Sequence, residues 1–157
     1  MRMPIVLAAI VLGGSIVSAE AAGPVCGAFT LVGGEKAINV IDNPPAGKSP
    51  GDVRAGWRKL ADEAGNAAGS VQFVATLTEP GAPGGDVLAG AYFVRLAEGY
   101  IASQTVYQLP DSNDTSQKAQ NAVLVVTGGT GPYAGAAGTI EIVAGDAPRY
   151  VFDLHCP

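Results

Sequence analysis

Glycine and proline are the residues that most restrict how this chain can fold. The sequence has 22 glycines and 11 prolines among 157 residues. Inside a helix a glycine costs about 1 kcal/mol and a proline about 3 kcal/mol relative to alanine, so long helices are disfavoured. The segments between them are rich in β-branched and aromatic side chains, and several alternate apolar and polar positions. We predict strands at 28–32, 36–41, 53–60, 70–77, 87–96, 100–109, 123–127, 139–143 and 150–154.

The connections between these strands are predicted from their turn residues. The stretch 79–86 holds Pro80-Gly81 and Pro83-Gly84-Gly85, and we expect an open loop that does not continue a sheet. Residues 97–99 are expected to form a short hairpin connection, and 111–120 a polar loop. A domain made of this many strands must hide its edges, so the pattern predicts a closed barrel or a sandwich.

The amino end has the three parts of a secretory signal peptide. Arg2 supplies a basic start, residues 4–17 are apolar, and small side chains follow, with Ala19 and Ala21 at the positions that a signal peptidase reads. The apolar run is shorter than the ~20 residues that a membrane-spanning helix needs. We therefore expect cleavage after Ala21 or Ala22 rather than a membrane anchor.

The charge of the chain excludes two classes of partner. Nine Lys and Arg residues stand against 14 Asp and Glu residues, which gives a formal net charge of −5. Scattered basic residues in an acidic chain form no footprint for nucleic acid or anionic lipid. We expect residues 1–21 to be the signal peptide and residues 22–157 to form one domain, secreted or periplasmic, with no nucleic-acid partner and no membrane contact after cleavage.

The two cysteines lie near the ends of the expected mature chain. In an exported protein an even pair favours a disulfide, and we predict a bridge between Cys26 and Cys156. A metal site would need three or four ligands, and the single histidine, His155, has no second cluster beside it. We expect no metal site, and one terminal histidine does not support a Ser/His/Asp triad.

A glycine-rich stretch, VVTGGTGPYAGAAG at 125–138, is the most distinctive motif. It lacks the Lys-Ser/Thr ending of a phosphate-binding P-loop, and β-branched residues rather than a helix pattern follow it. A structural role fits better, because glycines after a strand permit a sharp turn into the next strand. Tyr133 would cover that turn as an aromatic plug.

This motif resembles the signature hairpin of the allene oxide cyclase-like and dirigent-like barrels. Other stretches agree with that family in order and spacing over about residues 37–154: SPGD at 49–52, AGSV at 68–71 with the strand at 73–77, and GYIASQ at 99–104. Thr105 stands where the family usually has glycine, and Ala137 where a larger residue is common.

The resemblance implies an all-β fold, a closed eight-stranded antiparallel β-barrel with an apolar central cavity. Plant members of the family are trimers that cyclise an unstable fatty-acid epoxide or steer the coupling of phenoxy radicals. A homotrimer, a small hydrophobic or phenolic ligand and chemistry without a cofactor are therefore implied. Both activities hold a reactive substrate in one conformation, which lowers the entropic part of the barrier.

Candidate site residues follow from the same resemblance and from strand alternation. The cyclase uses a carboxylate reached from its first long strand, and here only Asp42 could supply that catalytic acid. The usual turn preferences favour the alternative that Asp42 caps the turn before Asn43-Pro44. The ligand-binding candidates are Asn39, Arg95, Gln104 and Tyr107. One parity of each barrel strand faces inward, and the sequence leaves open which one.

Three functions remain open at this point. The leading hypothesis is a secreted barrel that binds a small hydrophobic or phenolic molecule and steers a cofactor-free cyclisation or isomerisation. The alternative is a non-catalytic structural or interaction domain that keeps the barrel. A weaker third is a lectin-like or inhibitor sandwich, which a barrel topology would exclude.

Overall fold

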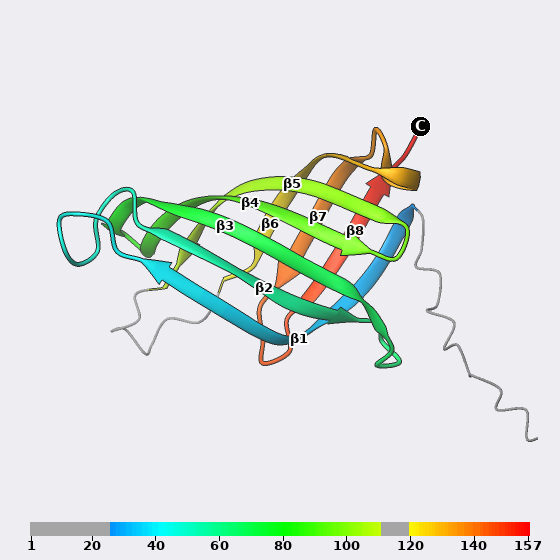
Figure 1. Cartoon of the computed structure of the whole chain (residues 1–157), viewed down its shortest axis with the longest axis horizontal. Coiled ribbons are helices and arrows are strands. Elements are labelled where there is room, and N and C mark those ends of the chain that lie inside the picture. The colour runs from blue at the N-terminus through cyan, green and yellow to red at the C-terminus, as the bar shows by residue number, and fades with distance from the viewer. Residues whose placement is uncertain (1–25, 111–119) are drawn as a thin grey trace, which may run out of the picture.

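The chain folds into a closed eight-stranded antiparallel barrel, shown by the computed structural model in Figure 1, which describes residues 26–110 and 120–157. Each strand pairs with its neighbours in sequence, and the last pairs with the first. The elements are β1 (Gly27–Ile41), β2 (Val53–Ala61), β3 (Ala67–Ala82), β4 (Gly85–Leu96), β5 (Gly99–Leu109), β6 (Ala122–Gly129), the 3-10 turn η1 (Gly131–Tyr133), β7 (Ala137–Val143) and β8 (Arg149–His155).

This topology confirms the all-β class and decides for the barrel over the sandwich. The predicted signal peptide lies outside the described residues, as does the predicted loop at 111–120 except for its last residue. No helix in the described ranges has the length and apolar character needed to cross a membrane.

The barrel closes where β1 meets β8. Residues 27–32 of β1 lie opposite residues 149–154 of β8, and the Gly33 amide donates to the Pro148 carbonyl at 2.7 Å just beyond that ladder. Cys26 and Cys156 form the predicted disulfide beside it, with their Cα atoms 6.2 Å apart. The covalent bond and the hydrogen-bond ladder therefore join the same two strands.

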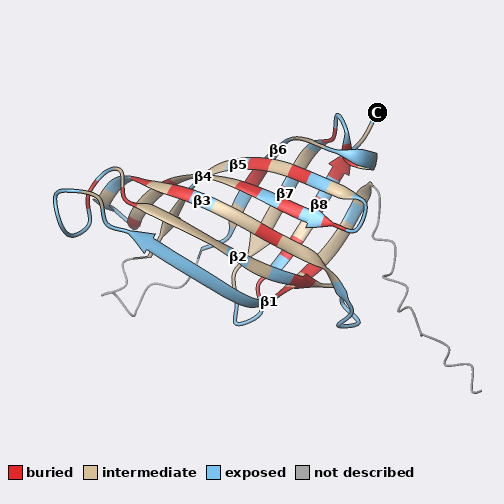
Figure 2. Ribbon diagram, in the orientation of Figure 1, coloured by how far each residue is buried: buried red, intermediate tan, exposed pale blue. Residues whose placement is uncertain are grey.

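The first strand is longer than expected. The separate strands predicted at 28–32 and 36–41 are one element, β1, with a register shift between Gly33 and Lys36 where it pairs with β2. Residues 27–32 pair with β8, Val32 and Gly33 pair with the end of β2, and residues 36–41 pair with β2 alone. The stretch 36–41 is exposed along its whole length (Figure 2).

The predicted open loop at 79–86 is wrong. β3 continues to Ala82 and β4 begins at Gly85, so the two strands form a hairpin in which Glu79 still pairs with Val87. Register shifts on both sides of Glu79 place Pro80 in an irregular part of the ladder. A proline is tolerated at such a bulge because its missing N–H is not needed there.

The glycine-rich corner is a structural turn, as predicted. β6 ends at Gly129, η1 follows, and the Tyr133 side chain is almost fully buried beneath the corner. A Cβ at Gly129 would lie 2.7 Å from the Tyr133 Cβ, so only glycine lets the tyrosine pack this closely. The Thr130 amide donates to the Tyr100 carbonyl at 2.8 Å, which ties the corner to β5.

Inward-facing side chains form a dry core at the end of the barrel that carries the disulfide and the corner. Figure 2 shows the alternation of buried and exposed residues that produces it. Its members come from all eight strands and are mainly aliphatic; they include Leu31, Leu60, Val71, Val94, Ile101, Leu124, Ile140 and Phe152. This core closes one end of the barrel, and a second, smaller buried cluster of Ala75, Leu77 and Leu88 lies toward the other end.

Removing the disulfide should destabilise the barrel without changing its topology. The bridge joins residues 130 positions apart, and the loop-entropy relation gives up to about 5 kcal/mol for a loop of this length. We expect the double variant Cys26→Ser/Cys156→Ser to lose several kcal/mol of unfolding free energy in urea denaturation, while its far-ultraviolet circular dichroism stays that of the wild type. An unchanged urea midpoint would contradict this account.

Candidate functional site

The other half of the barrel contains a cavity of about 410 Å³ that is open to solvent, which we call the lumen. All eight strands contribute to its wall, so it is the interior of the barrel rather than a surface cleft. The main lining residues are Lys36 and Ile38 of β1, Arg54 and Arg58 of β2, Phe73 of β3, Tyr92 of β4, Tyr107 of β5, Ala122 of β6, Ile142 of β7 and Tyr150 of β8.

The cationic wall of the lumen is set by the register of β1 and β2. Lys36 lies opposite Arg58, and Val40 lies opposite Arg54. Side chains of opposed residues share one face of an antiparallel pair, so the three cations point to the same side. Gly56 lies between the two arginines, and a Cβ there would be 3.0 Å from the Phe73 ring. The glycine thus makes room for the Phe73 ring against β2.

The aromatic side of the lumen is a connected group of rings. Phe73 stacks on Tyr92 with ring centroids 5.6 Å apart, and Tyr107 meets Tyr92 edge to face at 6.3 Å. Burial raises the pKa of Tyr92 and of Tyr150; nearby Tyr107 raises that of Tyr92 further, while Arg58 partly opposes the rise at Tyr150. The Tyr92 hydroxyl is hydrogen-bonded to Tyr107, whereas the Tyr150 hydroxyl accepts a hydrogen bond from Arg58 and keeps its own proton to donate.

The three cations have few partners in the protein. Arg58 donates from Nη1 to the Gly34 carbonyl at 2.9 Å and also contacts the Tyr150 hydroxyl. Over residues 26–110 and 120–157, none of Lys36, Arg54 and Arg58 forms an ion pair, and the lumen wall contains no carboxylate. In the same ranges no group of three or more His, Cys, Asp or Glu residues is arranged to hold a metal ion.

A loop braced by Asp52 stands beside the lumen. The Asp52 carboxylate is buried and accepts hydrogen bonds from the amides of Asn43, at 2.9 Å, and Ser49, at 3.0 Å. These bonds, first that from Ser49, hold the pKa of Asp52 below its ordinary value. Lys48 of the same loop pairs with Asp86 of β4 at 2.9 Å. Asp52, Asp86 and Arg54 line a smaller pocket of about 220 Å³ that shares Arg54 with the lumen.

The structure brings one of the sequence-predicted site residues into the lumen. Tyr107 lines it, whereas Asn39, Arg95 and Gln104 lie at positions of the opposite parity, on the outer face of the barrel. Asp42 lies in the exposed loop after β1, where its Oδ2 accepts a hydrogen bond from the Gly47 amide at 3.1 Å. That geometry is the turn cap described above, and a catalytic role for Asp42 stays a prediction.

Sequence reasoning missed the cations and two of the tyrosines. The signal for the cations was present in β2, where Arg54 and Arg58 share their parity with Leu60, which is buried in the dry core. The opposite parity holds Trp57, which is itself large and apolar. The pattern alone therefore did not say which set faces inward.

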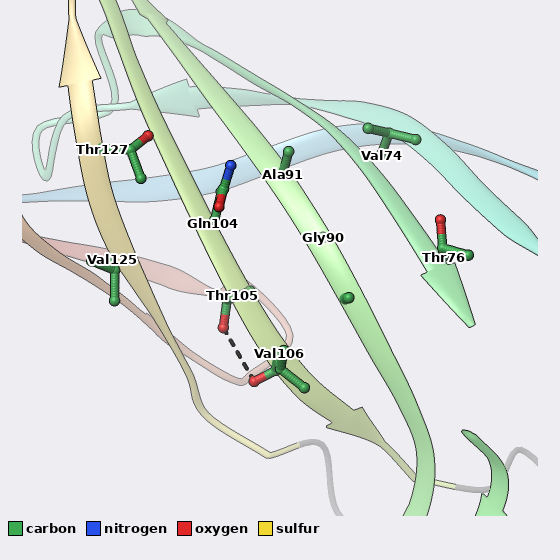
Figure 3. Close-up of a pocket in the computed structure, with 10 residues that line it drawn as sticks. Val74, Thr76, Gly90, Ala91, Gln104, Thr105, Val106, Val125 and Thr127 are labelled. Carbon is green, nitrogen blue, oxygen red and sulfur yellow. Dashed lines mark hydrogen bonds between the residues drawn. The ribbon is translucent and has the colours of Figure 1, made fainter. Parts of the chain in front are cut away.

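A second concave feature lies on the outside of the barrel, and we call it the outer groove. It has a volume of about 620 Å³ and crosses β3, β4, β5 and β6, as Figure 3 shows. Three of its valines are well exposed, Val74 at 43%, Val106 at 69% and Val125 at 58%. Clustered exposed apolar side chains of this kind mark contact surfaces more often than free surface.

Known structures share the fold, although no protein-family model matches the sequence and no curated protein matches it. The structure is similar to pyocyanin demethylase, with a TM-score of 0.66 and 21% identity over 82% of this chain and 99% of that one. It is also similar to AbnU, described as an exo-specific intermolecular Diels-Alderase, with a TM-score of 0.57 and 16% identity over 82% and 97% of the two chains.

A third similar structure is a nonspecific heme-binding cyclase that catalyses a [4+2] cycloaddition in neoabyssomicin biosynthesis, with a TM-score of 0.53 and 17% identity over 81% of this chain and 59% of that one. At these identities the likeness shows the small β-barrel fold and no more. It does not assign the chain to the allene oxide cyclase-like or dirigent-like family.

Protonation of Asp52 should contribute to the loss of thermal stability at low pH. Its folded-state pKa is below the unfolded value, so its contribution is present above pH 4 and is lost as the pH falls through the depressed pKa. We expect Asp52→Asn to lower the melting temperature at pH 7, and the gap to wild type to narrow toward pH 2. Thermal unfolding followed by circular dichroism between pH 7 and pH 2 measures the difference in melting temperature. A gap that stays constant with pH would contradict this role.

Proposed function

We propose that the lumen binds a small hydrophobic or phenolic molecule and holds it in one orientation. The observation that carries this proposal is the cavity of about 410 Å³, walled by all eight strands and lined on one side by connected aromatic rings. Ligand sites in proteins are typically concave, largely apolar and equipped with a few polar groups that fix orientation. The Tyr150 hydroxyl and the Arg58 guanidinium beside it are groups of that kind.

Steering a cyclisation or isomerisation is the chemistry that such a lumen suits. A flat substrate stacked on Phe73 and Tyr92 would lose conformational freedom before it reacts, and this lowers the entropic barrier without a cofactor. The printed names of the similar barrels, a demethylase of pyocyanin and Diels-Alderases, support small-molecule chemistry in this fold. The disulfide supports a secreted or periplasmic location, because such bonds persist in oxidising compartments.

Filling the lumen should abolish binding. We expect the neutral dye N-phenyl-1-naphthylamine to bind saturably with a rise in fluorescence, and 1-naphthol to displace it. Ala122→Trp places an indole in the lumen and should weaken dye binding at least about tenfold. The matched control is Ala28→Trp, at an exposed position of β1 outside the lumen, which should bind as the wild type does. Equal binding by both variants would refute a lumen site.

A second function, that of an interaction domain, is favoured by the outer groove. We propose that this groove is the contact between copies of the chain and that the protein forms the homotrimer implied by the sequence resemblance. Val106 and Val125 would lose their exposed apolar area in that contact. Binding in the lumen and association through the outer face are compatible, because the two sites use opposite parities of the strands.

Light scattering after size exclusion tests this association. We expect about three times the mass of one chain for the wild type. Val106→Glu places a charge in the groove and should give a monomer. Ile41→Glu, an exposed position of β1 outside the groove, should leave the trimer intact. A wild-type monomer would contradict the association.

A further inference from the structure

Three of the nine basic residues of the chain converge on the lumen. Lys36, Arg54 and Arg58 all line it, although the protein as a whole carries a formal net charge of −5. Their positions follow from one strand pair, since Lys36 lies opposite Arg58 and Arg54 is on the same face of β2 one inward position beyond Gly56. Within the part of the chain that the structure describes, the charged side chains that line the lumen are therefore all cations.

The acidic residues nearest to the lumen form hydrogen bonds or ion pairs with other groups, although Asp52 and Asp86 share a small pocket with Arg54. Glu35, which precedes Lys36, pairs with Lys59 instead. The Asp52 carboxylate is held by Asn43 and Ser49, and Asp86 pairs with Lys48. Among the residues that the structure describes, no carboxylate therefore forms an ion pair with a cation of the lumen.

The cations that line the lumen raise the free energy of the unliganded protein. Arg54 and Arg58 are partly buried and lose part of their hydration, whereas Lys36 is exposed at the rim of the lumen. The three like charges repel each other, and the low-dielectric walls concentrate their potential in the lumen. An anion placed in the lumen would relieve both costs. A neutral ligand of the same shape would relieve neither.

We propose that the ligand of the lumen is an anion, an aromatic or hydrophobic molecule that carries a carboxylate or an equivalent oxyanion. This rests on the proposed function and names its ligand class. The two arginines bind the oxyanion, because a guanidinium presents paired N–H donors that match a carboxylate in geometry. The apolar body of the ligand packs on Phe73 and Tyr92, and the Tyr150 hydroxyl, already in contact with Arg58, lies on the same side as the bound charge.

Three probes of nearly equal shape test the proposal by isothermal titration calorimetry at pH 7.5. These are 2-naphthoate, which is an anion, 2-naphthalenemethanol, which is neutral, and 2-naphthylmethylamine, which is a cation. We expect 2-naphthoate to bind at least about tenfold more tightly than the neutral alcohol, because the alcohol lacks the charged hydrogen bond to arginine. The amine should bind most weakly, because it is a cation.

Substitutions at the two arginines test whether these residues cause the preference for the anionic probe. Arg54→Gln and Arg58→Gln should each weaken 2-naphthoate binding about tenfold or more and leave 2-naphthalenemethanol within about twofold of wild type. Arg54→Lys keeps the charge and should keep the preference for the anion in reduced form, which also separates a charge effect from misfolding. The matched control is Arg95→Gln on the outer face, which should leave every probe unchanged.

The outcomes separate this inference from the proposed function. If the alcohol and the naphthoate bind equally, or if both arginine variants keep the full preference, the lumen binds small molecules but is not selective for anions, and the inference is overturned alone. If none of the three probes binds, the proposed function and the inference are both overturned.

Discussion

The pairing of β1 with β8 is the contact on which the rest of the structure depends. Residues 27–32 and 149–154 complete the ladder, and the Cys26–Cys156 bond joins the same strands. Without this pairing the strands would form an open sheet with two edges of unpaired backbone groups. With it the sheet has an interior, and only an interior can hold polar side chains together away from bulk water. The lumen exists because the sheet closes.

The residues of the dry core and those of the lumen lie on the same strands and on the same face of each strand. On β2 one face presents Arg54 and Arg58 to the lumen and then Leu60 to the dry core. On β4 Tyr92 belongs to both, because it packs in the buried core with Val94 and also lines the lumen. The alternation of a strand places these residues on one face, so a single register error would move both the core and the lumen residues outside. This linkage couples the integrity of the binding wall to that of the fold.

The sequence predicted most of the strands, the disulfide and the glycine corner, because these depend on local pattern and on compartment. It failed at 79–86 and at the break it placed inside β1. Glycines at 33–34, and glycines with prolines at 79–86, favour a turn locally. In both places the neighbouring strand supplies enough pairing to carry the ladder across a bulge. Long-range pairing outweighed the local preference there.

The candidate site shows more clearly what could not be predicted from the sequence. The alternation of β5 was clear from the sequence, and it divided the strand into one set with Gln104 and another with Tyr107. Both sets mix apolar and polar residues, so hydrophobicity could not choose between them. Closure of the barrel decides which set faces inward. The set that contains Ile101, Ser103 and Tyr107 points into the barrel, and Ile101 and Ser103 are fully buried there. The sequence by itself determined where the strands lie and how their side chains alternate. Only the tertiary structure decided which side chains face one another across the lumen, since that depends on contacts between residues far apart in the chain.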